Sequence, residues 1–274
     1  MQQRTLAFIG AGNMSRSIIA GLIQAGYPAE RIIAANPSRP KLDELASQFG
    51  IRITQDNAEA AREAEVIVLA VKPQLMAGML TTLVAELGSL DGKLLISIAA
   101  GIRVARLQEM AGGHDRIIRT MPNTPSLLGL GMTGLYAPPA IGQADRAVAE
   151  QMMQSVGKTL WVDEEAGING VIAAAGSAPA YFFLFMQAIA EEAEAMGFTP
   201  EQARLLVQQT ALGAAAMVEQ NPDLSLQTLR ERVTSKGGTT AEAVKTFQEQ
   251  GLMPLTARAM QAAVTRAGEM ETLF

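Results

Sequence analysis

The sequence contains no cysteine and only one histidine, His114. The lack of cysteine excludes disulfide scaffolds, cysteine-ligated zinc, iron–sulfur clusters and thiol nucleophiles, and it favours a cytoplasmic location. A serine-hydrolase triad would have to use His114, which directly follows Gly112-Gly113 and is therefore expected in a surface turn. We predict neither a metal site nor a hydrolase of this kind.

Charged and aromatic residues are also scarce, at 18% and 4% of the 274 residues. The net charge of −5 and the pI of about 5.1 argue against nucleic acid and against an anionic membrane as the main partner. With 49% hydrophobic residues the chain can bury a sizeable core. Its length corresponds to one large domain or two small ones.

No targeting segment is predicted, because the apolar run Leu6–Gly12 ends at glycines too early for a signal peptide. One later stretch, Gly167–Ala190, contains no charged side chain and is long enough to span a bilayer. Asn169, Pro179 and Gln187 interrupt it. These interruptions favour a buried helix, or a helix packed against another subunit, over a membrane span.

The first part of the chain alternates short apolar runs with helical patterns of apolar residues, such as those over 14–23 and 42–49. Apolar residues follow one another in these runs, as in strands covered on both faces. The predicted strands are Thr5–Ile9, Arg31–Ala35, Glu65–Val71, Lys93–Ile98 and Arg116–Thr120. This alternation predicts an α/β fold in which residues 1–161 form a Rossmann-type, doubly wound parallel sheet.

After Trp161 the strand signals end, and residues 162–274 are predicted to form an all-α domain. Thr199 and Gln202 have the spacing of a capping box before a helix over 203–218. Further helices are expected over 224–233, over 240–250 and from Pro254 onward. The many alanines suit close helix–helix packing, including packing between subunits.

The turn Gly10-Ala11-Gly12-Asn13-Met14-Ser15 follows the first predicted strand and opens the first helix. Gly10 allows a tight turn, Gly12 lets the backbone approach a pyrophosphate, and the helix N-terminus offers free amides. Ser15 is a small substitute for the third glycine of the fingerprint. The pattern favours dinucleotide binding over a purely structural turn.

The end of the second predicted strand bears on which dinucleotide is bound. An NAD enzyme usually has an acidic residue there, whereas this chain has Asn36, Ser38 and Arg39. These side chains can donate hydrogen bonds to a 2′-phosphate, which favours NADPH, with NADH as the alternative. The alternative interpretation is that Arg39 is an ordinary solvated residue with no phosphate contact.

Three further segments stand out. Ala70-Val71-Lys72-Pro73 ends a strand at the edge where ligands bind, although Lys72 is more typical of a solvated residue than of a catalyst. Small residues in Ser97–Gly101 would let a nicotinamide ring lie close to the backbone.

In Val233–Thr240, Thr239 and Glu242 have capping-box spacing. This last segment is either a capped helix start or a site for a small anion, held by free amides and by the hydroxyls of Ser235 and Thr240.

Together these motifs resemble the pyrroline-5-carboxylate reductases, which complete proline synthesis, over essentially the whole chain. The motifs that carry the resemblance are Phe8–Met14, Ala70–Pro73, Met121–Pro125, Gly176–Tyr181 and Ser235–Thr240. Ala178 and Lys236 depart from the family, which often has glycine and proline there. Both residues flank the expected site.

The resemblance implies hydride transfer from NADPH to the C=N bond of 1-pyrroline-5-carboxylate, giving L-proline. It places the substrate carboxylate on Ser235, Gly237, Gly238, Thr239 and Thr240, with Thr240 as the catalytic residue facing the ring nitrogen and Glu165 near the substrate. The implied cofactor contacts are Ile9, Gly10, Ala11, Gly12, Asn13, Met14, Asn36, Ser38, Arg39, Asn57, Ala70, Val71, Lys72, Pro73, Ile98, Ala99 and Ala100. It also implies a domain-swapped helical dimer, often built into a larger ring.

Two alternatives remain open from the sequence. A β-hydroxyacid-type NADP dehydrogenase of similar two-domain build would need a general base to oxidise an alcohol. A non-catalytic NADPH-binding regulatory protein would bind the cofactor without turnover.

Overall fold

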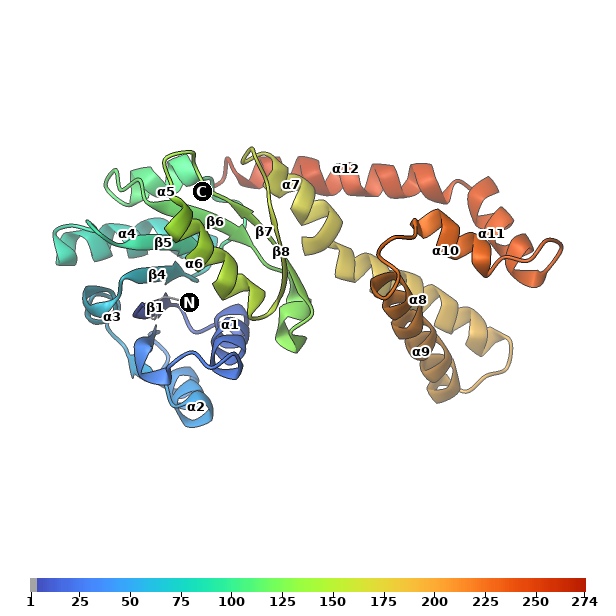
Figure 1. The fold of residues 1–274 in the computed structure, drawn as a ribbon, viewed down its shortest axis with the longest axis horizontal. Coiled ribbons are helices and arrows are strands. Elements are labelled where there is room, and N and C mark those ends of the chain that lie inside the picture. The colour runs from blue at the N-terminus through green and yellow to red at the C-terminus, as the bar shows by residue number, and fades with distance from the viewer. Residues whose placement is uncertain (1–3) are drawn as a thin grey trace. The chain divides into compact units, whose positions relative to one another are not determined.

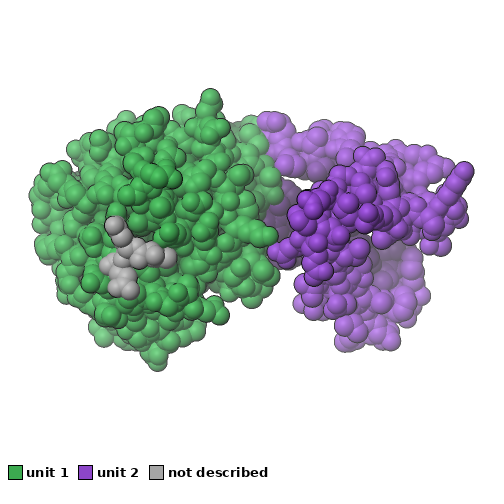
Figure 2. Space-filling view, in the orientation of Figure 1, with its two compact units in different colours: residues 1–177, 263–274 green, residues 178–262 purple. Residues whose placement is uncertain are grey.

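The computed structural model describes residues 4–274. The chain divides into two compact units (Figure 2). Unit 1 contains the described residues up to Ser177 together with Ala263–Phe274, and unit 2 contains Ala178–Ala262. Residue 161, where the sequence places a domain boundary, is the last residue of the last strand, and unit 1 continues beyond it to Ser177.

Unit 1 is built on an eight-stranded sheet in the order β3-β2-β1-β4-β5-β6-β7-β8 (Figure 1). Neighbouring strands are parallel except β6 and β7, which are antiparallel. The strands are β1 (Leu6–Ile9), β2 (Ile32–Ala35), β3 (Arg52–Thr54), β4 (Val66–Leu69), β5 (Leu94–Ser97), β6 (Ile117–Met121), β7 (Gly131–Tyr136) and β8 (Gly157–Trp161).

Helices cover both faces of this sheet. Successive strand residues point to opposite faces, and apolar strand residues lie on both faces. In β1, Leu6 and Phe8 join one core cluster, and Ala7 and Ile9 join the other. Helices α1 (Asn13–Gln24), α2 (Arg39–Phe49) and α6 (Gln143–Gln154) supply the first cluster, and α3 (Asn57–Glu63), α4 (Pro73–Leu87) and α5 (Val104–Met110) supply the second. The predicted doubly wound sheet is confirmed.

The sequence did not reveal β3, β7 or β8. β3 has only three residues, and β7 and β8 contain glycines that are untypical of strands. Close packing requires these glycines. A Cβ on Gly157 would lie 2.0 Å from the Gly131 carbonyl oxygen of the neighbouring strand, and one on Gly134 would lie 2.7 Å from the side chain of Val171, a helical residue.

Unit 2 is helical, as predicted. It contains α8 (Ala178–Ala195), α9 (Pro200–Glu219), α10 (Leu226–Arg232), α11 (Thr239–Glu249) and the first part of α12 (Leu252–Met270). The capping box of α9 is present, since the Thr199 hydroxyl accepts from the Gln202 amide and the Gln202 side chain accepts from the Thr199 amide. α12 begins two residues before the predicted Pro254.

The uncharged stretch predicted as one helix is divided in the structure. It forms α7 (Gly167–Val171), a π-helical turn over Ile172–Gly176, and α8. Within residues 4–274, Gly167–Ala195 is the one helical stretch long and apolar enough to cross a membrane. Much of its apolar surface is exposed in the single chain, for example 66% of Phe182 and 67% of Leu184.

Candidate active site

The predicted cofactor contacts gather at one edge of the sheet. Parallel strands end at a common carboxyl edge, where ligands of doubly wound folds bind. Because β2, β1, β4 and β5 are neighbours in this order, the loops that follow them lie side by side (Figure 1). These loops carry Gly10–Met14, Asn36–Arg39, Ala70–Pro73 and Ile98–Ala100, and Asn57 opens α3 beyond β3.

The turn after β1 has the geometry that the fingerprint predicts. Gly10 has φ +111°, and a Cβ there would lie 2.6 Å from the Ala70 carbonyl oxygen, so only glycine fits. Gly12 is the N-cap of α1, and a Cβ there would meet no atom within 4 Å. No side chain caps α1 and no acidic residue lies in its first turn. An anion can therefore approach this helix end directly.

Asn36 joins the loop after β2 to this turn. Its Oδ1 accepts from the Ala11 amide at 3.2 Å, and its Nδ2 donates to the Ser38 carbonyl at 3.3 Å. Ser15, in place of the third glycine, donates a buried hydrogen bond to the Gly10 carbonyl at 2.7 Å. These bonds fix the shape of the dinucleotide turn from both sides.

The first turn of α2 is basic. Ser38 is the N-cap but makes no side-chain cap, and Arg39 and Lys41 follow with no acidic residue in that turn. Cations are unfavourable near a helix N-terminus, and their presence here suits a bound anion. Arg39 is exposed and pairs with Asp43 one turn on, at 2.8 Å. Lys41 was not among the residues predicted from the sequence.

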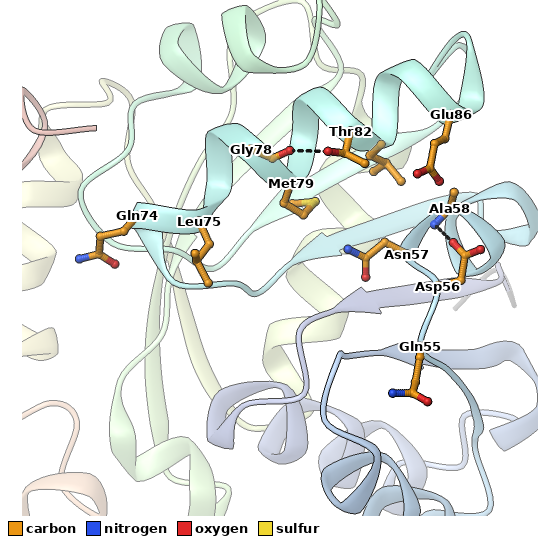
Figure 3. Close-up of a pocket in the computed structure, with 11 residues that line it drawn as sticks. Gln55, Asp56, Asn57, Ala58, Gln74, Leu75, Gly78, Met79, Thr82 and Glu86 are labelled. Carbon is orange, nitrogen blue, oxygen red and sulfur yellow. Dashed lines mark hydrogen bonds between the residues drawn. The ribbon is translucent and has the colours of Figure 1, made fainter.

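Asn57 lines a groove between the start of α3 and the exposed face of α4, with a volume of about 640 Å³ (Figure 3). Asp56 caps α3 by accepting from the amides of Ala58 and Glu59. Gln74 and Leu75, from the first turn of α4, lie at the other end of the groove. The groove therefore adjoins the loop Ala70–Pro73.

On the other side of β1, backbone amides of the loop after β5 donate hydrogen bonds that hold this part of the edge. The Ile98 amide donates to the Leu69 carbonyl at 3.2 Å, and the Ala99 amide donates to the Ser97 hydroxyl at 3.3 Å. Ala100 and Val71 are half-buried, whereas Lys72 is exposed. Lys72 therefore has the solvated setting that its residue type indicates.

The segment predicted to hold the substrate forms a glycine turn in unit 2. Gly237 has φ +73°, and Gly238 is the N-cap of α11. The predicted capping by Thr239 is wrong: Thr239 is the first helical residue, and no side chain caps α11. A glycine at the N-cap leaves the amides of Thr239 and Thr240 at the open helix end. The Gly238 amide donates to the Ser235 carbonyl at 3.0 Å.

Glu165 lies in unit 1, in a charged cluster that the sequence did not reveal. Its Oε1 accepts from the Val104 amide at 2.7 Å and from Arg119 Nη1 at 2.9 Å. Glu271 Oε1 accepts from the same Nη1 at 3.0 Å. The available signal was Arg119 itself, a charged residue inside the otherwise uncharged strand Ile117–Met121.

A doubly wound sheet with a glycine turn and an open helix end after β1 is the architecture of a Rossmann-type, dinucleotide-binding protein. The family description "NADP oxidoreductase coenzyme F420-dependent" matches residues 5–101, and "Pyrroline-5-carboxylate reductase dimerisation" matches residues 165–270. A pyrroline-5-carboxylate reductase from Vibrio alginolyticus is 58% identical over 274 residues, all of both chains.

Solved structures agree with this match. A pyrroline-5-carboxylate reductase from Coxiella burnetii has 41% identity and a TM-score of 0.93, covering 98% of this chain and 99% of that one. A Plasmodium falciparum pyrroline carboxylate reductase with NADP bound has 28% identity and a TM-score of 0.84, covering 99% of both chains. The chain belongs to the pyrroline-5-carboxylate reductase family. It is an NAD(P)H-dependent oxidoreductase that self-associates.

Proposed function

We propose that this chain reduces the C=N bond of 1-pyrroline-5-carboxylate to give L-proline, the last step of proline synthesis. Bound NADPH supplies the hydride. A protonated imine is already electrophilic, so the protein needs to orient the reactants and exclude water more than to move protons. A chain whose single histidine, His114, bonds to the Lys93 carbonyl suits such chemistry.

The start of α11 would hold the substrate. The carboxylate would accept from the amides of Thr239 and Thr240 and from the Ser235 hydroxyl, and the Gly237-Gly238 turn gives it room to approach. The Thr240 hydroxyl would contact the ring nitrogen. Glu165 has a less direct part, because its Oε1 already accepts from Val104 and Arg119, which leaves Oε2 for any substrate contact.

The turn Gly10–Met14, with Ile9 before it, would hold the cofactor pyrophosphate. Asn36, Ser38 and Arg39, joined by Lys41, would hold the adenosine phosphate, and Asn57 the adenosine ribose. Ala70–Pro73 and Ile98–Ala100 would line the nicotinamide side. We also propose the division into a dinucleotide-binding domain, 1–161, and a helical domain for dimerisation and substrate binding, 162–274.

The observation that carries the proposal is the uncapped glycine turn at α11, in a chain with full-length reductase relatives. A hydroxyacid dehydrogenase needs a general base, and α11 begins with Thr239 and Thr240 instead. The test is NADPH oxidation on adding 1-pyrroline-5-carboxylate, run beside oxidation of 2- and 3-hydroxyacids by NADP⁺. Turnover of a hydroxyacid alone would favour the dehydrogenase, and cofactor binding without any turnover would favour the regulatory protein.

Arg39→Asp is expected to raise the KM for NADPH by about tenfold, as loss of one ion pair with a phosphate, and to leave the KM for NADH nearly unchanged. Asp43→Asn is the matched variant, because it removes the helix partner of Arg39 and should leave NADPH use intact. Steady-state kinetics with each nucleotide measure the difference. Equal effects of Arg39→Asp on both nucleotides would exclude the 2′-phosphate contact.

Self-association would bury the exposed apolar face of α8 and α9. Phe182→Glu combined with Leu184→Glu is expected to yield 29.0 kDa monomers in light scattering, since buried aromatic anchors dominate interface energies. Thr81→Glu, at an exposed position of α4, is the control for added charge. A wild-type chain that is an active monomer would contradict this assignment.

The apolar helical stretch is then an interface between subunits rather than a membrane span. The partners proposed are the small-molecule substrate and further copies of the chain, which form a dimer and a larger ring, with no nucleic acid or membrane. The biosynthetic role of the chain's relatives favours a cytoplasmic location.

A further inference from the structure

Arg119 is the largest fully buried side chain of residues 4–274, with 1% of its side chain exposed. It lies on β6, opposite Ser97 at the end of β5 and Tyr136 at the end of β7. A buried guanidinium is costly unless it is paired, and apolar side chains of similar size often give equal or better stability. Stability alone therefore does not account for an arginine at this place in the sheet.

The pairing of Arg119 ties three separated segments together. Its Nη1 contacts Glu165 Oε1 at 2.9 Å, from the loop before α7, and Glu271 Oε1 at 3.0 Å, directly after α12. Glu271 also pairs with Arg103 at 3.4 Å. Both carboxylates approach the same nitrogen, and Nη2 makes no hydrogen bond to the protein. This is not the bidentate geometry that makes an arginine–carboxylate pair strongest.

The cluster reaches the active-site edge through Glu165. Arg103 is the N-cap of α5 but makes no side-chain cap, and the Val104 amide donates instead to Glu165 Oε1 at 2.7 Å. Glu165 thus supplies the cap of α5 from a distant part of the chain. The ion pair with Arg119 holds that carboxylate in place.

The segment anchored in this way is 98–104, which leaves β5 and begins α5. Its first residue is fixed by the bond from the Ile98 amide to the Leu69 carbonyl. At its middle, Gly101 packs so closely on α12 that a Cβ there would lie 3.2 Å from the Cβ of Met270. The bond between Val104 and Glu165 fixes its end. The proposed nicotinamide contacts Ile98–Ala100 belong to this segment.

We propose that Arg119 is a positioning residue for hydride transfer, which acts through Glu165 to fix segment 98–104. The inference depends on the proposed reductase function. Loss of Arg119 should disturb only the nicotinamide side of the cofactor site, because the proposed adenosine contacts lie in the loops that follow β2 and β3. A small displacement of reacting groups can lower a rate by about a hundredfold without loss of binding.

The test compares Arg119→Gln and Arg119→Lys with a matched ion cluster elsewhere in unit 1. Asp145 accepts from Arg4 at 3.0 Å and from Arg116 at 2.5 Å, and it is buried. It lies on α6, which follows β7, and β7 runs opposite to β6. Asp145→Asn therefore removes a buried ion cluster at the far edge of the sheet from the cofactor loops.

Four quantities are measured for each variant: kcat with 1-pyrroline-5-carboxylate, the NADPH Kd, Tm, and the fluorescence of bound NADPH. The fluorescence of bound NADPH reports the nicotinamide environment independently of turnover. Arg119→Gln and Asp145→Asn should both lower Tm. Only Arg119→Gln should lower kcat, by about ten- to a hundredfold, and shift the fluorescence, with the NADPH Kd within about threefold. Arg119→Lys, which keeps the charge, should recover part of kcat and part of the wild-type fluorescence.

A folded Arg119→Gln with kcat within twofold of wild type would overturn the inference, as would an equal loss of kcat in Asp145→Asn. If Arg119→Gln does not fold, Arg119→Lys decides: unchanged kcat and unchanged fluorescence overturn the inference, and a loss of kcat with intact NADPH binding supports it. A wild-type chain that never reduces 1-pyrroline-5-carboxylate would instead reject the proposed function.

Discussion

Gly12→Val is expected to weaken NADPH binding at least about a hundredfold, equivalent to about 2.8 kcal/mol, while the chain keeps its fold. Gly12 has φ −85°, which any residue adopts, and a Cβ there meets no protein atom within 4 Å. The added side chain would instead occupy the space that the pyrophosphate needs at the open end of α1. Equilibrium titration with NADPH and a melting curve measure the two effects.

Gly142→Val is the matched control. Gly142 is the N-cap of α6 with φ −68°, and a Cβ there also meets nothing within 4 Å. The end of β7, which leads to α6, lies at the sheet edge opposite to the dinucleotide turn, since β7 is antiparallel to β6. NADPH affinity should therefore stay at the wild-type level. Unchanged affinity in Gly12→Val would reject the placement of the pyrophosphate.

Thr240→Val is expected to lower kcat by about ten- to a hundredfold with little change in NADPH binding. Valine keeps the shape and β-branching of threonine and removes only the hydroxyl. A hydrogen bond to a charged group contributes about 1.5–3 kcal/mol. As hydride adds to the imine carbon, the C=N electron pair moves onto the ring nitrogen, and the Thr240 hydroxyl would stabilise that nitrogen in the transition state. Rapid-mixing kinetics with saturating NADPH measure the loss directly.

Thr239→Val is the neighbouring control. Because Gly238 and not Thr239 is the N-cap of α11, this variant should melt close to the wild-type temperature. Its backbone amide remains, so carboxylate binding should also persist. If Thr240→Val turns over at the wild-type rate, the hydroxyl has no part in the reaction, and only the amides of the turn remain as the substrate site.

The strand and turn geometry at the proposed cofactor edge was predictable because it depends on local signals. Backbone geometry within one turn requires glycine at position 10, and the uninterrupted apolar runs of β1, β2, β4 and β5 predict buried parallel strands. The order of those strands then brings the predicted loops together. Local chemistry and the general rules of doubly wound folds were sufficient here.

Other features depend on contacts between residues that lie far apart in the sequence, which local sequence patterns do not predict. The glycines of β7 and β8 reflect close packing against a neighbouring strand or helix, and glycines are untypical of strands, so neither strand was predicted. The cap of α5 comes from Glu165, 61 positions away, and Glu271 is 152 positions from its partner Arg119. For α11, capping-box spacing alone suggested Thr239, whereas the glycine before it provides the helix start.

The central claim is that this chain transfers hydride from NADPH to the imine carbon of 1-pyrroline-5-carboxylate. The most direct measurement uses NADPH deuterated at the transferable position of the nicotinamide and follows the product by NMR and mass spectrometry. The account predicts L-proline carrying one deuterium, on the ring carbon that is bonded to nitrogen and does not bear the carboxylate. Recovery of unlabelled substrate, with NADPH bound but not oxidised, would contradict it.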